Sequence, residues 1–146
     1  RRDPPGEGIV RLRTETRGRA RALQLLYAAE TLDRPLASVV PGLAKLTGPE
    51  PTVLDLAERL AQEVWDARKE LDALLQDATD NWRIERLAAI DRNILRIGAY
   101  ELRSGQVPPR VAIDEALWVA HRFGTPQSPP FVNGVLDRVA RSLGLL

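Results

Sequence analysis

Apolar residues recur at helical spacing along almost all of this 146-residue chain. Leucines and valines three or four positions apart share one face of an α-helix, because the helix turns by about 100° per residue. The strict alternation that marks a half-buried strand is missing from the sequence, as are hairpin dipeptides. An apolar content of 44% is typical of a globular protein with a core. The sequence therefore predicts an all-α fold.

Prolines, glycines and capping residues divide this pattern into about seven helices. Thr52 is expected to cap the third helix, which should run unbroken to about Ala78. Ser128 is expected to cap the last helix, with proline at its first position. The segment across 82–102 should form one or two helices. Apart from this segment, the helices are expected at about 15–32, 36–46, 52–78, 109–123 and 129–143.

The chain should form one domain after a short tail. Residues 1–14 lack periodicity and are predicted to be a mobile N-terminal tail, so that 15–146 makes up the domain. A natural division near Asp80 predicts two subdomains, about 15–80 and 81–146, packed together because no flexible linker separates them. Their charges differ: residues 9–27 carry five arginines against one acid, whereas 50–91 carry eleven acids against five bases. Two surfaces for two partners are expected.

Few residues offer catalytic or metal-binding chemistry. The sequence has no cysteine, which excludes a disulfide frame and a thiolate site, and His121 is its single histidine. Asp114 and Glu115 diverge around a helix, and no glycine-rich phosphate loop occurs. We therefore expect no enzyme activity, no metal and no cofactor. Without a signal peptide or a membrane-length apolar run, a soluble cytoplasmic protein is expected.

The first predicted helix carries a basic row on one side. Because a helix turns by about 100° per residue, one narrow stripe contains Arg13, Arg17, Arg21 and Gln24. Tyr27 lies beside the C-terminal end of this stripe. The opposite side should face a core and contains Leu23, Leu25, Leu26 and Ala29. Guanidinium groups pair with phosphates, while an amide and a phenol ring can meet bases, so the row is suited to RNA. A solvated helix face is the alternative, and Arg19 lies nearer the apolar side, where it could pair with an acid.

Aromatic residues could also meet a base. Trp65, Trp82 and Trp118 all lie in segments of apolar periodicity, which favours core packing for each. Phe131 falls in the first turn of the last helix, where free backbone N–H groups can hold a phosphate. Its spacing favours a core position, and an exposed stacking platform is the alternative.

Three segments in fixed order form a distinctive pattern. They read RGRARALQLLY at 17–27, RLAAIDRNILRIGAYEL at 86–102, and VPPRVAIDEA leading to FVNGVLD at 107–137. Together they resemble the NusB family of bacterial transcription antitermination factors, and the final FVNGVLD run is the most specific part. The resemblance covers nearly everything after Thr14.

The resemblance implies a helical fold of two small bundles and a non-enzymatic RNA-binding adaptor. Family members bind single-stranded boxA RNA of ribosomal RNA operons jointly with the ribosomal protein NusE, within the transcription elongation complex. The resemblance implies that RNA is bound by Arg17, Arg19, Gln24, Tyr27 and Phe131, and so favours an exposed Phe131 over a core position. With the rest of the basic row and Asn133, the predicted RNA-binding residues are Arg13, Arg17, Arg19, Arg21, Gln24, Tyr27, Phe131 and Asn133. The implied surface for the protein partner contains Asp91, Tyr100 and Glu101.

The chain departs from the family pattern at several positions. Glu15 and Thr16 stand where relatives often carry arginine, and Pro129 and Pro130 replace more polar residues. Two other functions fit the same residues. One is the NusB-like RNA-binding domain of a ribosomal RNA cytosine-5 methyltransferase. The other is a helical protein-interaction module, including a homodimer that covers the arginine row.

Overall fold

The computed structural model describes residues 13–146, and all of its regular elements are helical. The prediction of a mobile tail therefore falls outside the described residues, except for Arg13 and Thr14, which cap and begin the first described helix. The all-α fold class is confirmed. The described elements are α2 (Thr14–Leu32), α3 (Leu36–Thr47), α4 (Pro51–Asp66), α5 (Arg68–Asp77), the 3₁₀ turn η1 (Ile84–Arg86), α6 (Ala89–Ser104), α7 (Pro109–Phe123) and α8 (Ser128–Ser142).

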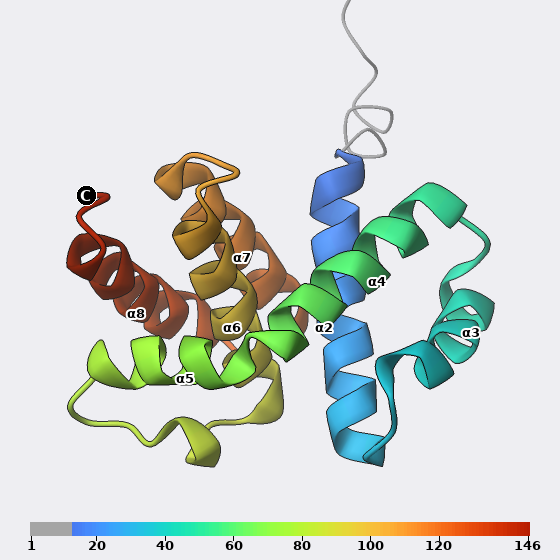
Figure 1. Ribbon diagram of the computed structural model, residues 1–146, viewed down its shortest axis with the longest axis horizontal. Helices are drawn as coiled ribbons and strands as arrows, with labels where there is room; N and C mark the ends of the chain where they lie inside the picture. Colours follow the sequence, from blue (N-terminus) through green and yellow to red (C-terminus); the bar gives the residue numbers. More distant parts are fainter. Residues whose placement is uncertain (1–12) are drawn as a thin grey trace, which may run out of the picture.

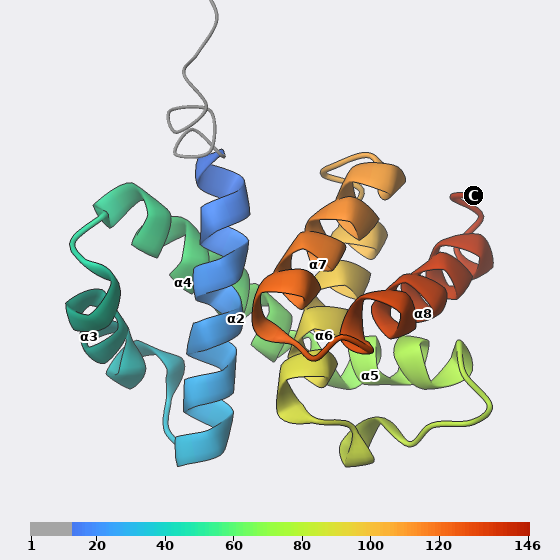
Figure 2. The same ribbon diagram turned by 180° about the vertical axis from the view of Figure 1, so that it is seen from behind.

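The helices pack as two groups that share one core. Helices α2, α3 and α4 contact one another, while α5, α7 and α8 surround α6 (Figure 1). Contacts of α6 and α7 with α2 join the groups, and α2 stands beside α7 when the molecule is seen from behind (Figure 2). Helix α5, which the division expected near Asp80 would place with the first group, packs mainly on α6. The chain thus passes between the groups at Ala67.

The prediction of one unbroken third helix is wrong. The helix ends at Asp66, and a new one begins at Arg68 after Ala67 adopts φ −96° and ψ 8°. Here the Arg68 guanidinium donates to the Trp65 carbonyl at 2.9 Å and lies 4.0 Å from the centre of the Trp65 ring. A side chain thus satisfies a carbonyl at the break, and α5 is free to turn onto α6.

Two predicted N-caps are also wrong by one or two positions. Helix α4 begins at Pro51 with Glu50 as N-cap, because proline is favoured at a first helical position and lacks the N–H that a cap would satisfy. Helix α8 begins at Ser128 itself, with Gln127 as N-cap. The Ser128 hydroxyl instead accepts the Thr125 N–H at 3.0 Å and donates to Asp91 at 2.7 Å. It therefore fastens the start of α8 to the start of α6.

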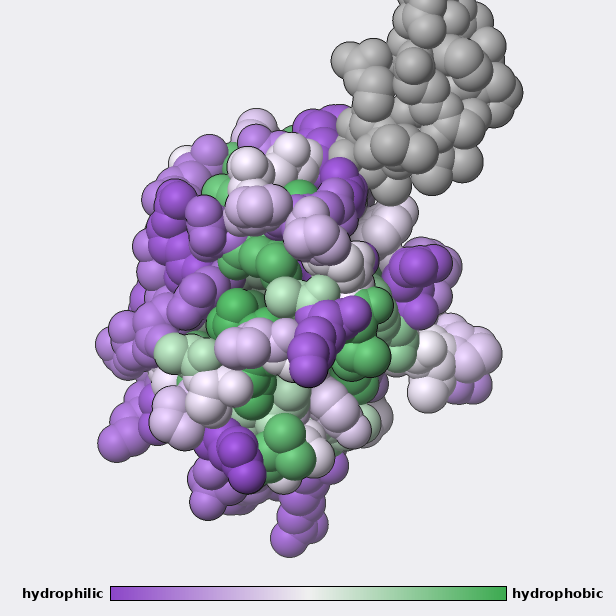
Figure 3. Space-filling model, turned by 90° about the vertical axis from the view of Figure 1, so that its right-hand side faces the viewer, coloured by the Kyte–Doolittle hydropathy of each residue, from purple (hydrophilic) through white to green (hydrophobic). Residues whose placement is uncertain are grey.

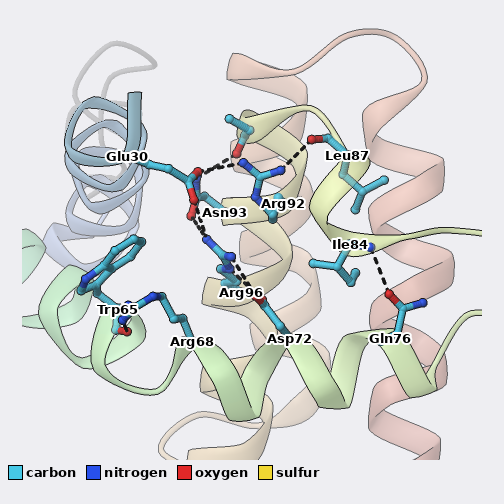
Figure 4. Close-up of polar contacts among 11 residues, drawn as sticks. Glu30, Trp65, Arg68, Asp72, Gln76, Ile84, Leu87, Arg92, Asn93 and Arg96 are labelled. Carbon is cyan, nitrogen blue, oxygen red and sulfur yellow. Dashed lines mark hydrogen bonds and ion pairs between the residues drawn. The ribbon is translucent and has the colours of Figure 1, made fainter. Parts of the chain in front are cut away.

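A polar network that helical periodicity does not reveal fixes α2 and α5 to α6 (Figure 4). Glu30 accepts hydrogen bonds from Arg92 at 2.9 Å, Asn93 at 3.1 Å and Arg96 at 3.2 Å. Arg96 also donates twice to Asp72, both times at 2.8 Å. Burial alone would raise the pKa of Glu30, but these donors and the Arg92 charge lower it below its ordinary value. The network holds the surface of α2 in a fixed orientation to the second helix group.

Candidate RNA-binding surface

Helix α2 separates a basic face from a buried face as the spacing predicts. The predicted core residues Leu23, Leu25, Leu26 and Ala29 are all buried, which confirms their placement. On the other side Arg13 is exposed, and Arg17, Arg21 and Gln24 are half-buried. Arg21 donates to the Gln24 side-chain oxygen at 2.7 Å, and Tyr27 keeps 40% of its surface exposed. The row therefore combines cations, an amide and an accessible aromatic ring.

Positive charge accumulates where α2 passes the end of α7. Burial lowers the pKa of Arg21, and repulsion from Arg17 and Arg122 lowers it further. Arg122 is exposed at the end of α7 and was not predicted as a site residue, because only the fold brings it to α2. Glu50, from the turn before α4, forms an ion pair with Arg17. An anion bound between these guanidinium groups would relieve their mutual repulsion.

Arg19 does not join this row, and its predicted contact with RNA is at odds with the structure. It is only 6% exposed, and its Nε and Nη2 atoms each donate to Glu101 at 2.8 Å. Its Nη1 atom donates to Glu115 at 3.2 Å. Burial would lower the pKa of Arg19, but the hydrogen bonds and charges of these two carboxylates raise it. Arg19 thus joins α2 to α6 and α7 from the interior, the pairing that its position near the apolar side allowed.

An apolar groove of about 550 Å³ borders the lower end of the row. Gln24, Tyr27 and Phe123 lie along it, together with Leu43 and Leu46 of α3. The groove is open because the short helix α3 covers α2 only in part, and Leu46 remains 86% exposed. Figure 3, which faces the α3 side, shows hydrophobic residues gathered in the middle of this face with hydrophilic ones around them. Tyr27 is therefore flanked by surface that can accept the apolar face of a ligand.

Phe131 lies at the start of α8 and is neither fully buried nor isolated. Its ring meets that of Trp82 edge to face, with centroids 4.9 Å apart and planes at 68°. Phe131 is half-buried and Trp82 is 46% exposed, so the core position predicted for Trp82 is wrong. Trp65 and Trp118 are half-buried and pack against the core. Trp82 escapes the core because it lies in the loop before η1 and not on a helix.

Asn133 is exposed on α8 but does not face the same way as Phe131. Two residues correspond to about 200° around a helix, which directs these side chains to different sides. The groove beside Phe131 is accordingly lined by Gln127 and by residues of the α5–α6 connection, and not by Asn133. Phe131 and Asn133 are therefore not brought together.

The three residues implied for the protein partner do not form one patch. Asp91 accepts the Ser128 hydrogen bond, and Glu101 is occupied by Arg19. The Tyr100 hydroxyl donates to Glu63 of α4 at 2.8 Å. Burial raises the pKa of Tyr100, and the hydrogen bond and charge of Glu63 raise it further. The nine residues from Asp91 to Tyr100 turn the helix by about two and a half turns, which puts these side chains on opposite sides of α6. Of the three, Asp91 and Glu101 serve internal contacts of the fold.

Within residues 13–146, no group of three or more histidine, cysteine, aspartate or glutamate side chains is placed to hold a metal ion. His121 is exposed near the end of α7, beside the basic residue Arg122. No helix in the same part of the chain is both long and apolar enough to cross a membrane.

Comparison with known proteins decides the family. The model of the NusB family matches residues 16–141, which is nearly the whole of the described structure. The chain belongs to the NusB family. Transcription antitermination protein NusB of Anaeromyxobacter dehalogenans is 41% identical over 132 residues, covering 88% of this chain and 91% of that protein. The counterpart from Sorangium cellulosum is 41% identical over 128 residues, with 87% and 91% covered. These relatives are named as antitermination factors and not as enzymes.

Solved structures of the NusB family share the fold. The structure of T. maritima NusB matches with a TM-score of 0.75 and 31% identity, covering 87% of this chain and 90% of that one. A crystal structure of the antitermination factors NusB and NusE in complex with dsRNA matches with a TM-score of 0.79 at 20% identity, with 90% and 98% covered. The arrangement of two helix groups is therefore that of NusB proteins.

Proposed function

We propose that this NusB protein is an RNA-binding adaptor of transcription antitermination. It binds single-stranded boxA RNA of ribosomal RNA operons jointly with the ribosomal protein NusE, in the elongation complex of the cytoplasm. The observation that carries the proposal is the accessible face of α2 that joins Arg17, Arg21 and Gln24 to the exposed ring of Tyr27. Family membership supports it, because the curated relatives are antitermination proteins.

Each part of the surface has its own task in this proposal. Arg13, Arg17 and Arg21 attract and position phosphates, a contribution that depends on salt but not on sequence. Gln24 and Tyr27, beside the apolar groove, contact unpaired bases, and Phe131 provides a stacking ring. The half-buried settings of Arg21 and Gln24 favour this role, because fewer conformations are lost when RNA binds.

We place NusE against α4 and α5, because residues 50–91 carry eleven acids against five bases. Tyr100 and Glu63 link α6 to α4 there, next to a segment that carries more acids than bases. An acidic surface complements a basic ribosomal protein and would speed its association. In the solved complex with dsRNA, NusB and NusE are bound together. The methyltransferase alternative is not favoured, because the curated relatives match over about nine-tenths of their own length as antitermination proteins.

The test is a titration of a boxA oligonucleotide and a scrambled control, each with and without NusE, at two salt concentrations. The proposal predicts a preference for boxA that increases when NusE is present. Weak and equal binding to both RNAs under all conditions would refute it and leave a protein-interaction module. The oligomeric state is measured in the same samples, because a homodimer that covers the arginine row would compete with RNA.

A further inference from the structure

Trp82 and Phe131 line a second groove, of about 580 Å³, between the α5–α6 connection and the start of α8. The two rings meet at 68°, so they form a corner rather than a stack. A planar group that stacks on one ring of such a corner presents its edge to the other, the two arrangements that aromatic systems prefer. Trp82 keeps 46% of its surface exposed in this groove, so its ring is accessible to a planar ligand.

The Trp82 side of this corner is held in place although Trp82 lies in a loop. The side-chain amide of Gln76 on α5 donates to the Trp82 carbonyl and accepts the Ile84 N–H, at 2.5 and 3.0 Å. Figure 4 shows Gln76 reaching from α5 to Ile84. On the other side of the corner, Asp91 and the Ser128 hydroxyl hold the first turn of α8. Both rings are thus positioned before any ligand arrives, which lowers the entropic cost of stacking.

The charges around the corner favour a nucleotide. Arg83 and Arg86 line the groove on the side of η1. Arg83 is paired with Glu85, whereas the exposed Arg86 guanidinium has no hydrogen-bond or ion-pair partner within residues 13–146. The Asp91 carboxylate is occupied by Ser128. A base in the corner would place its phosphate within reach of a cation, and Gln127 adds a polar group for a base edge.

We infer that the corner of Trp82 and Phe131 binds one unpaired RNA base, with Arg86 contacting its phosphate. The inference rests on the proposed function and extends it, because it carries the RNA path from α2, past Arg122 at the end of α7, to the α5–α6 connection. The two grooves adjoin in sequence at the start of α6, where Ile90 lines the groove at Tyr27 and the next residue, Asp91, lines the second groove. Trp82 is then an RNA-contacting residue and not a core residue.

The experiment combines protein variants with boxA oligonucleotides that each lack one base. Loss of a stacked base weakens binding by about 5- to 150-fold. Trp82→Ala should therefore weaken intact RNA within that range, while Trp82→Phe retains most of the affinity. One abasic position should weaken binding to the wild type but change binding to Trp82→Ala by less than 2-fold. Arg86→Ala should lower the salt dependence of the RNA affinity and leave the preference among bases unchanged.

Tryptophan fluorescence shows whether Trp82 itself stacks on a base or only supports the ring of Phe131. In a variant with Trp65→Phe and Trp118→Phe, Trp82 is the sole tryptophan. Saturating intact RNA should quench its emission, and RNA that is abasic at the sensitive position should not. Emission that is the same with both RNAs would overturn the inference, because a purely structural Trp82 does not sense the base.

The outcomes also separate this inference from the proposed function. If Arg17→Ala weakens RNA binding and Trp82→Ala does not, the corner is no base site while the RNA-binding function stands. If Trp82→Ala weakens only the binding of NusE, the groove is a protein-docking surface and the inference is overturned. If the wild-type protein binds no RNA at all, both proposals fail.

Discussion

Replacing Arg19 by alanine should reduce stability without touching the RNA surface. The Arg19 guanidinium makes three hydrogen bonds with Glu101 and Glu115, whose side chains are 12% and 18% exposed. The variant leaves two carboxylates close together without a counter-charge. Breaking a buried ion pair by removing one partner costs about 3–5 kcal/mol. Because some water reaches both carboxylates, we expect a loss of stability at the lower end of this range, about 3 kcal/mol.

This loss is large enough to measure by thermal unfolding. In a domain of about 150 residues, 1 kcal/mol shifts the melting temperature by about 2–4 °C, so Arg19→Ala should lower it by about 6–12 °C. RNA binding, measured at a temperature where the variant is folded, should keep its salt dependence. The matched variant is Arg17→Ala, whose pair with Glu50 is reached by solvent, with side chains 31% and 38% exposed, and contributes at most about 1 kcal/mol to stability. It should reduce the slope of log K against log salt by about 0.7.

The reverse pattern would refute this reasoning. An Arg19→Ala protein of wild-type stability with a reduced salt slope would mean that Arg19 leaves its carboxylates to meet a phosphate. Arg19→Lys provides a further check, because a lysine keeps the charge but cannot form the two-pronged contact with Glu101. Its melting temperature should lie between those of the wild type and Arg19→Ala.

Three further changes probe other contacts. Glu50→Gln frees Arg17 for phosphate and should strengthen RNA binding by about 1.5- to 5-fold in a low-salt titration; weaker binding would contradict the assigned pairing. Because the folded pKa of Glu30 lies below its ordinary value, its ionised form stabilises the fold at pH above that ordinary value, and this contribution is lost as pH falls through the folded pKa. Glu30→Gln should thus have a lower free energy of unfolding in urea at pH 7 than the wild type, and this free energy should fall less steeply as the pH is lowered. If the two proteins lose stability in parallel as the pH falls, the Glu30 network does not contribute to acid sensitivity. Gly124→Ala brings a Cβ into collision with the Ser128 side chain, so unfolding should show a loss of about 1–3 kcal/mol in stability, and unchanged stability would mean that the turn before α8 is adaptable.

The fold could be predicted from the sequence wherever local signals were strong. The helix from about 15 to 32 has a clear apolar stripe and is followed by Pro35, and the structure places it at Thr14–Leu32. The break at Ala67 has no proline or glycine, because it arises from packing of α5 on α6 and from the side chain of Arg68. Such a break depends on residues distant in sequence, and periodicity cannot reveal it.

The candidate site was predictable to a similar degree. Helical spacing is enough to put Arg17, Arg21 and Gln24 on one side of a helix. It cannot show that Arg122 approaches them from α7, since that neighbour is set by the fold. The core position predicted for Trp82 is wrong for a related reason: an apolar position just before a helix is equally compatible with the core and with an exposed loop.

The most direct test of the account is ultraviolet crosslinking of boxA RNA to the protein, with the attached residues identified by mass spectrometry. If α2 and the start of α8 form one RNA-binding surface, crosslinks should fall on Tyr27 and Phe131 and in the peptides around Arg17 and Arg122. Crosslinks confined to α4 and α5, on the acidic side, would contradict the account. The basic row of α2 would then be a solvated helix face.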